Sequence, residues 1–284
     1  MKHCLNTLST IVLLGALLTT TGVRAAGPGH PEGTVISFGV VPQQAASRLA
    51  KLWMPVLDYL SEHSGHTLRF KTAPDIPAFE AACARGEYDM AYMNPYHYTV
   101  FRKAPGYRAF AKEKDKQIRG IIVVRKDSPL AELSELSGKT LAFPSPLAFA
   151  ASMLPRASLK EQGIDITPRY VSSHDSVYRA VAKELFEAGG GVLRTFKNTD
   201  PEISEQLRIL WTTDSYTPHA IAVHPRIDAE VTRQIEEAML AMDEDPRGKS
   251  LLNALRFTGI EMALDREWDE IDALQMETLG LEGK

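Results

Sequence analysis

Short β-branched runs alternate with amphipathic stretches along most of this chain, and that alternation limits the possible fold more than any other feature. Residues 35–41 have the pattern of a buried strand, which ends at Pro42. The apolar side chains that follow recur at helical spacing and form one face, made of Leu49, Leu52, Trp53, Val56, Leu57 and Leu60. Strands that alternate with helices predict an α/β fold with mainly parallel sheets flanked by helices.

Further elements continue the same alternation. Strands are expected at residues 67–71, 90–94, 118–125, 140–143, 169–171, 191–195, 207–212 and 220–224. Helices are expected at residues 76–85, 147–162, 174–188, 228–242, 249–255 and 266–276. The glycines at 189–191 lack the spacing of a dinucleotide-binding loop. They predict either a turn before a strand or a place where backbones pack closely.

The N-terminal 25 residues have the features of a secretory signal peptide. Lys2 precedes a short apolar core at residues 11–18, and Val23 and Ala25 supply small residues for a cleavage site. This core is shorter than the roughly 20 residues that span a bilayer, which disfavours the alternative of a membrane anchor. We therefore predict a signal peptide at 1–25, a flexible leader at 26–33 and a periplasmic location.

The charge and the cysteine content argue against two classes of protein. The net charge is −4, and it becomes −6 when residues 1–25 are removed with Lys2 and Arg24. Non-specific nucleic-acid binders normally have a basic excess, so no nucleic-acid partner is expected. The second cysteine, Cys83, then has no partner for an internal disulfide, and the fold must rely on a large apolar core.

Motifs of common catalytic and metal sites are absent from the sequence. There is no G-x-S-x-G elbow and no H-E-x-x-H pair. Ser173, His174 and Asp175 have the letters of a catalytic triad, but consecutive side chains do not converge, and Ser173 is better placed as the N-cap of a helix. His63 and His66 lack a third metal ligand. We predict a protein that is not an enzyme, with no catalytic residue, metal or cofactor.

A cluster of aromatic and polar residues follows the strand expected at 90–94. Asn94, Tyr96 and His97 surround Pro95, which is expected to open a helix. A helix start presents free N–H groups and the positive end of a dipole, which suits an anion. Tyr92 is expected to fill core, whereas Asn94, Tyr96 and His97 are candidates for contact with a small-molecule ligand.

Five segments carry motifs whose order and spacing match one known family. They are GVVPQQ at 39–44, A-x-x-x-GEYDMAYMNP at 82–95, S-x-LSGKTLAF at 134–143, VSSHDSV at 171–177 and GGVLRT at 190–195. Together they resemble the periplasmic phosphate/phosphite/phosphonate-binding proteins of ABC transporters. The resemblance implies a two-lobed periplasmic binding protein of type II with two crossover strands, at 118–125 and 220–224. Lobe one would be 34–121 plus 225–284, and lobe two 122–224.

The same resemblance implies where a ligand is held, in the cleft between the lobes. Lobe one would contribute Tyr96 and His97. Lobe two would contribute the remaining contacts, at Ser145, Ser173, His174, Asp175, Arg194 and Thr195. His219 would border the crossover that returns to lobe one.

One segment departs from the pattern of the family. Residues 144–155 read PSPLAFAASMLP, where phosphonate binders of this family have a Ser/Thr-rich turn with glycine. Leu147 and Phe149 replace hydroxyl donors, which thins the side-chain cage for a dianion. A less charged, apolar or lipid ligand is therefore an alternative to an oxyanion, and plain helix packing of Leu147 and Phe149 is another account of the change.

The resemblance implies a transport receptor that captures a small oxyanion and delivers it to a membrane ABC permease. The first alternative is the same fold serving a sensor kinase. A periplasmic enzyme is the second, but it needs a nucleophile beside His97, His174 or His219, and the sequence indicates none. The family also implies a monomer.

Overall fold

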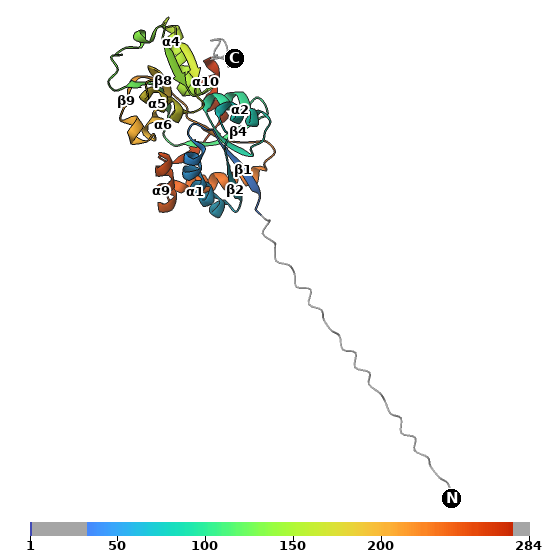
Figure 1. Ribbon diagram of the computed structural model, residues 1–284. Coiled ribbons are helices and arrows are strands. Elements are labelled where there is room, and N and C mark those ends of the chain that lie inside the picture. The colour runs from blue at the N-terminus through green and yellow to red at the C-terminus, as the bar shows by residue number, and fades with distance from the viewer. Residues whose placement is uncertain (2–32, 275–284) are drawn as a thin grey trace. The chain divides into compact units, whose positions relative to one another are not determined.

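The computed structural model describes residue 1 and residues 33–274. The predicted signal peptide and leader fall almost entirely outside the described residues and stay predictions. Within the described part of the chain, no helix combines the length and the apolar character needed to cross a membrane. Residues 33–274 contain two mixed sheets flanked by helices, which confirms the predicted α/β fold (Figure 1). The expectation of mainly parallel sheets is wrong, because five of the nine strand pairings among these residues are antiparallel.

The first sheet has six strands in the order β11-β4-β10-β3-β1-β2. Its strands are β1 (Val35–Val40), β2 (Thr67–Lys71), β3 (Met90–Met93), β4 (Arg108–Glu113), β10 (Ala220–Val223) and β11 (Ile260–Met262). β1 pairs in parallel with β2 and β3, whereas β10 pairs antiparallel with β3 and β4. The carboxyl ends of β1 and β3 therefore lie at one edge, where the segments that begin at Val41 and Asn94 follow.

The second sheet has five strands in the order β7-β6-β8-β5-β9. Its strands are β5 (Ile118–Arg125), β6 (Thr140–Phe143), β7 (Thr167–Tyr170), β8 (Ala188–Val192) and β9 (Leu207–Tyr216). β6 is parallel to β7 and β8, and β5 is antiparallel to β8 and β9. In Figure 1 this sheet carries the green and yellow middle of the chain, and the first sheet carries the blue and orange parts.

The chain passes between the sheets at two short connections. Residues 114–117 lead from β4 to β5, and residues 217–219 lead from β9 to β10. The strands predicted as crossovers are therefore not shared between the sheets. Backbone hydrogen bonds place the whole of β5 in the second sheet and the whole of β10 in the first.

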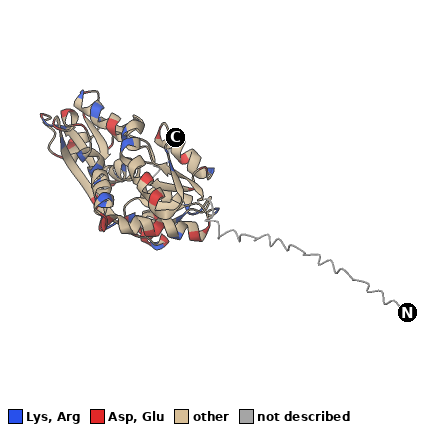
Figure 2. Cartoon of the chain, turned by 90° about the horizontal axis from the view of Figure 1, so that it is seen from below, with Lys and Arg blue, Asp and Glu red and all other residues tan. Residues whose placement is uncertain are grey.

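Helices pack on both sheets, and the longest, α1, lies against α8 and α9. The α-helices are α1 (Ala46–Ser64), α2 (Ile76–Ala84), α3 (Pro95–Phe101), α4 (Leu154–Glu161), α5 (His174–Ala182), α6 (Leu193–Lys197), α7 (Pro201–Ser204), α8 (Ala229–Leu240), α9 (Pro246–Leu255) and α10 (Asp269–Ala273). Short 3-10 turns are η1 (Leu133–Leu136), η3 (Ala241–Asp243) and η4 (Asp265–Trp268), and η2 (Phe149–Met153) is π-helical. Acidic and basic residues lie interspersed over these elements (Figure 2).

Two strands were missed and one was misplaced by the sequence patterns. β4 and β11 are short and mix charged with apolar residues, so their periodicity is weak. The strand predicted at 191–195 is wrong, because β8 occupies Ala188–Val192 and the next five residues form the helix α6. The glycines of β8 allow close packing: a Cβ atom on Gly190 would lie 2.0 Å from the carbonyl oxygen of Ala151. Close backbone packing, one of the two readings of these glycines, is thus confirmed.

Candidate functional site

Residues from both sheets surround one small buried space, which we call the buried cavity. The first sheet contributes Val41, Gln43 and Asn94, and the second contributes the start of η2 and His174. His219, from the connection between the sheets, completes it. Its volume is about 10 Å³. Three of the predicted site residues, Asn94, His174 and His219, therefore meet around one space although they are far apart in the sequence.

One wall of the buried cavity is the start of the helical segment that follows β6. η2 continues without a break into α4, and no side chain caps its first turn. Among the backbone hydrogen bonds of residues 33–274, none has the N–H group of Phe149, Ala150 or Ala151 as its donor. Such a helix start has unbonded N–H donors and the positive end of a dipole. This wall can therefore accept an anion through its backbone.

Two serine hydroxyls belong to the same segment. The Oγ atoms of Ser145 and Ser152 are buried and have no hydrogen-bond partner within the described residues. Buried hydroxyls without partners are uncommon, because each one costs the free energy of lost hydration. The predicted contact Ser145 thus lies beside a helix start that has hydrogen-bonding capacity left over.

His219 is buried with unused hydrogen-bonding capacity on both ring nitrogens. Its side chain is 1% exposed, and within residues 33–274 neither Nδ1 nor Nε2 has a partner. The imidazole stacks on the ring of Tyr92, with the centroids 4.8 Å apart. Burial, followed by the nearby charge of Arg194, holds the pKa of His219 well below its usual value. A neutral ring that lines the buried cavity can donate one hydrogen bond and accept another.

Both the backbone and the ring of His174 are held by hydrogen bonds beside the buried cavity. Its backbone N–H group donates to the carbonyl of Gln43, 2.9 Å away in the loop that follows β1 of the first sheet. Its ring atom Nδ1 lies 2.9 Å from Thr195 Oγ1. Burial is the main cause that lowers the pKa of His174 to about 3, and the charge of Arg194 adds to it. Thr195, another predicted contact, is therefore a partner of His174 and of the Tyr178 hydroxyl.

Ser173 and Asp175 have structural partners in this conformation. The Oγ atom of Ser173 accepts from the Ser176 N–H group at 3.1 Å and caps α5, as the sequence predicted. The carboxylate of Asp175 accepts from Gln44 Nε2 at 3.2 Å and from the Ala45 N–H group at 3.1 Å. Asp175 thereby links α5 to the loop after β1, across the two sheets.

Most of the polar groups at the start of α3 already form hydrogen bonds within the protein. Asn94 Oδ1 accepts from the His97 N–H group at 2.8 Å, and Asn94 Nδ2 donates to the Leu147 carbonyl at 3.2 Å. The Nε2 atom of His97 lies 2.8 Å from Glu80 Oε1. Tyr96 and His97 are buried, and neither is among the residues that line the buried cavity. The free helix start expected here is capped.

Arg194 joins the two sheets. From α6 its guanidinium donates to Glu113 Oε2 at 2.7 Å and to the Tyr92 hydroxyl, and it lies 5.1 Å from the Phe257 ring centroid. Burial raises the pKa of Glu113, and the guanidinium opposes that shift. Glu113 was missed by the sequence patterns because β4 was missed. The charge of Arg194 is thus already matched by a buried carboxylate.

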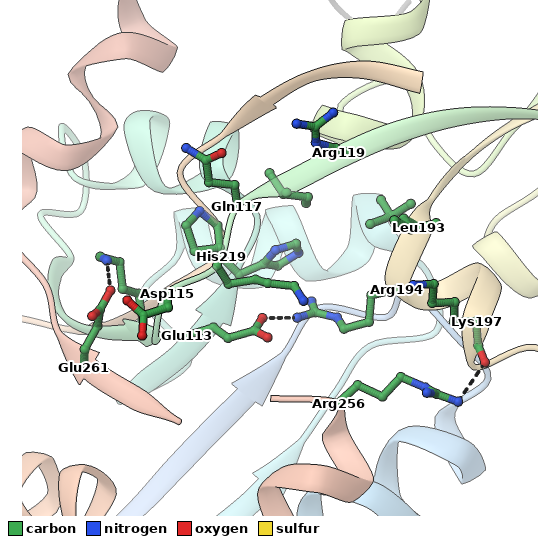
Figure 3. A pocket seen from close by; sticks show the side chains of 15 residues that line it. Glu113, Asp115, Gln117, Arg119, Leu193, Arg194, Lys197, His219, Arg256 and Glu261 are labelled. Atoms are coloured by element: carbon green, nitrogen blue, oxygen red, sulfur yellow. Dashed lines mark hydrogen bonds and ion pairs between the residues drawn. The ribbon is translucent and has the colours of Figure 1, made fainter. Parts of the chain in front are cut away.

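A second, larger space lies beside the buried cavity, and we call it the cleft (Figure 3). It has a volume of about 780 Å³ and shares Ile118, Val192 and His219 with the walls of the buried cavity. Basic residues line it, namely Lys112, Lys116, Arg119, Arg194, Lys197 and Arg256. The cleft also contains Glu113, Asp115 and Glu261. Most of these residues were not predicted, although the sequence has a visibly charged stretch at 112–119.

Comparison with known proteins gives one consistent result. Residues 38–268 match the family described as the periplasmic substrate-binding protein of the phosphonate ABC transporter. The phosphate-import protein PhnD of Mycolicibacterium smegmatis is 23% identical in an alignment of length 249 that covers 76% of this chain and 73% of that protein.

Two solved structures share the fold. A binding protein component of an ABC phosphonate transporter from Pseudomonas aeruginosa superposes with a TM-score of 0.80 at 16% identity, covering 88% of each chain. PhnD1 of Prochlorococcus marinus, solved with methylphosphonate, gives a TM-score of 0.79 at 17% identity and covers 87% of this chain and 98% of its own.

Proposed function

The chain belongs to the periplasmic substrate-binding proteins of phosphonate ABC transporters, and we propose that the buried cavity is where it binds the phosphonate or phosphate group. The family is a transport component and not an enzyme, and it serves a membrane permease. The observation that carries the proposal is the uncapped start of η2, which faces His174 and the unpartnered ring of His219.

Backbone donors supply what the side chains of this segment lack. The N–H groups of Phe149, Ala150 and Ala151 can each donate to an oxyanion, and the dipole of the 13-residue segment from η2 to α4 favours negative charge there. Phe149 itself is buried and packs edge-on against Tyr216, with the ring centroids 5.6 Å apart. Its apolar side chain therefore supports the packing account of the altered segment and gives no reason to propose a lipid ligand.

The ligand needs a change of conformation to enter. A volume of about 10 Å³ holds roughly one water-sized sphere, which is less than a phosphonate group requires. We propose that the sheets move apart about the connections at 114–117 and 217–219, as lobes of binding proteins do around a hinge. The two lobes would then follow the sheets, with their limits at these connections instead of at residues 121 and 224.

The export of the chain, its transport partner and its oligomeric state are also proposals. Cleavage of a signal peptide at residue 25 would bring the chain to the periplasm, where the family acts. We propose an ABC permease as the partner and a monomeric state, because the family implies both. A sensor kinase as the receiver of the ligand-bound protein stays the alternative.

The proposal is tested by calorimetric titration of methylphosphonate and phosphate into protein purified from the periplasm. His219→Ala should weaken binding about tenfold or more. It loses no hydrogen bond among residues 33–274, but it removes a buried ring that stacks on Tyr92, so the free energy of unfolding should also fall, by about 2 kcal/mol. His63→Ala, at the far end of α1, is the matched control and should bind normally. Unchanged affinity in His219→Ala would exclude the buried cavity as the binding site.

A further inference from the structure

We propose that the natural ligand carries a second anionic group, and that the cleft beside the buried cavity binds that group. This inference rests on the proposed function, since it assumes that the first group, a phosphonate or phosphate, sits at the start of η2. It narrows the ligand class from phosphonates in general to those that also carry a carboxylate, a sulfonate or a second phosphate.

The two spaces are neighbours with a common wall. His219, Val192 and Ile118 line both of them, so a substituent on the bound phosphonate would reach the cleft after passing His219. A volume of about 780 Å³ is far more than a methyl group needs. In Figure 3, His219 and the Arg194–Glu113 pair lie in the middle of the view, while Arg119, Lys197 and Arg256 surround them.

The charges that line the cleft are unevenly matched. Glu113 is held by Arg194 and Glu261 by Lys112, so those carboxylates are neutralised within the protein. By contrast, the side chains of Lys116, Arg119 and Lys197 form no ion pair or hydrogen bond among residues 33–274. Within that range, the Arg256 side chain bonds only to neutral oxygens, those of Asn198 and Lys197. Asp115 is the one lining carboxylate of the cleft that these pairs leave unmatched.

This basic excess contrasts with the chain as a whole, whose net charge is −4. The four unmatched cations come from four segments: Lys116 from the connection at 114–117, Arg119 from β5, Lys197 from α6, and Arg256 from the position after α9. An anion between them would therefore contact groups from both sheets. A bound anion at this position would favour the arrangement in which the sheets are close, so it would add to affinity as well as to selectivity.

A positively charged substituent does not fit the same surroundings. Glu113 Oε1 has no hydrogen-bond partner in the described part of the chain and could accept from an ammonium group. However, Arg194 already holds the other oxygen, and the unmatched cations would repel an ammonium group. The geometry thus favours an anionic substituent over a cationic one.

The test compares three phosphonates with an uncharged, an anionic and a cationic substituent by calorimetric titration into protein purified from the periplasm. They are methylphosphonate, phosphonoacetate and 2-aminoethylphosphonate. Phosphonoacetate should bind about tenfold tighter than methylphosphonate, and 2-aminoethylphosphonate no tighter than methylphosphonate. The advantage of phosphonoacetate should shrink as salt is raised, because the cations of the cleft are partly exposed.

A double variant locates the effect. Arg119→Gln with Lys197→Gln should bring the affinity ratio of phosphonoacetate to methylphosphonate close to one and leave methylphosphonate binding within about twofold. Both side chains are exposed, so the variant should fold, and Lys51→Gln on the exposed face of α1 is the control.

Each outcome bears on a different claim. Equal binding of the three probes, or tightest binding of 2-aminoethylphosphonate, would overturn the second anionic group and leave the phosphonate site in place. An unchanged ratio in the double variant would show that the cleft does not recognise the substituent and would also overturn it. Absence of binding by all three probes would overturn the phosphonate site and, with it, this inference.

Discussion

Two helix starts face each other between the sheets, and they differ in how their polar groups are used. α3 begins after β3 with side chains rich in hydrogen-bonding groups, and most of these groups have partners: Asn94 caps the backbone N–H group of His97, and His97 Nε2 bonds to Glu80. The exception is His97 Nδ1, which has no partner among residues 33–274. η2 begins after β6 with apolar side chains, and its first N–H groups lack acceptors in the described chain. The helix start with fewer polar side chains is the one that has donors left for a ligand.

Polar residues near a strand end therefore do not by themselves identify the wall that binds a ligand. A side chain that can reach its own backbone is satisfied before any ligand arrives. Backbone N–H groups at an uncapped helix start cannot be satisfied locally, so they remain available. The four predictions that follow test this contrast, beginning with the largest expected effect.

Removing Arg194 should break the buried contact that joins α6 to β3 and β4. Arg194→Met leaves the buried carboxylate of Glu113 without its partner, which should lower the free energy of unfolding by about 3–5 kcal/mol. Thermal and urea unfolding measure the loss. The double variant Arg194→Met with Glu113→Leu should recover much of it, because no unpaired charge is then buried. Normal stability with lost oxyanion binding would instead mean that Arg194 contacts the ligand, as the sequence predicted.

Acidification should act through His174, on the η2 side of the buried cavity. The folded protein holds the pKa of His174 at about 3, mainly by burial, against a usual value of 6.5. Below pH 6.5 the unfolded chain therefore binds a proton that the folded protein does not. The stability that this group maintains is complete above pH 6.5 and falls by about 1.4 kcal/mol per pH unit as the pH drops toward 3.

Urea unfolding at pH 7 and pH 5 checks this pH dependence. Between these values His174 should account for a loss of about 2 kcal/mol. His174→Gln should lose correspondingly less stability over the same interval, because the amide does not titrate. Equal losses in the two proteins would show that His174 is not the group responsible.

Truncation of His97 tests the other helix start. His97→Ala removes a buried ring and leaves Glu80 without its hydrogen-bond partner, so the free energy of unfolding should fall by about 2 kcal/mol. Methylphosphonate affinity should stay within about twofold of the unchanged protein. A large loss of affinity with unchanged stability would restore His97 as a ligand contact and would remove the contrast between the two helix starts.

Loss of a helix N-cap should have the smallest effect on stability, and two variants allow a matched comparison. Asn94→Ala and Ser173→Ala each remove an N-cap and should each cost about 1 kcal/mol of stability. Asn94 lines the buried cavity and Ser173 does not, so methylphosphonate affinity should fall more for Asn94→Ala. Equal affinities in the two variants would mean that Asn94 acts only as a cap.

The fold was largely predictable, and the failures have physical causes. Runs such as 118–125 and 140–143 are apolar enough to predict strands with correct bounds. The strand β4, with the sequence RAFAKE, was missed because charged residues interrupt its apolar pattern, and Glu113 was missed with it. Its partner Arg194 lies 81 residues away, a pairing that no local pattern contains.

The site was predictable only in part. His174 and His219 could be predicted because their polar side chains are evident from the residue type, and both line the buried cavity. The donors of Phe149, Ala150 and Ala151 belong to the backbone, and their availability depends on where the helix begins and on the absence of a cap. The apolar sequence of this segment predicted too few side-chain donors for an oxyanion, whereas the structure leaves backbone N–H donors there.

The central claim is that the start of η2, and not the start of α3, holds the oxyanion. The most direct measurement is the change in backbone amide chemical shifts when methylphosphonate is added to ¹⁵N-labelled protein. We expect the largest changes at the N–H groups of Phe149, Ala150 and Ala151. Largest changes at Tyr96, His97 and Tyr98, with small changes at those three residues, would contradict it.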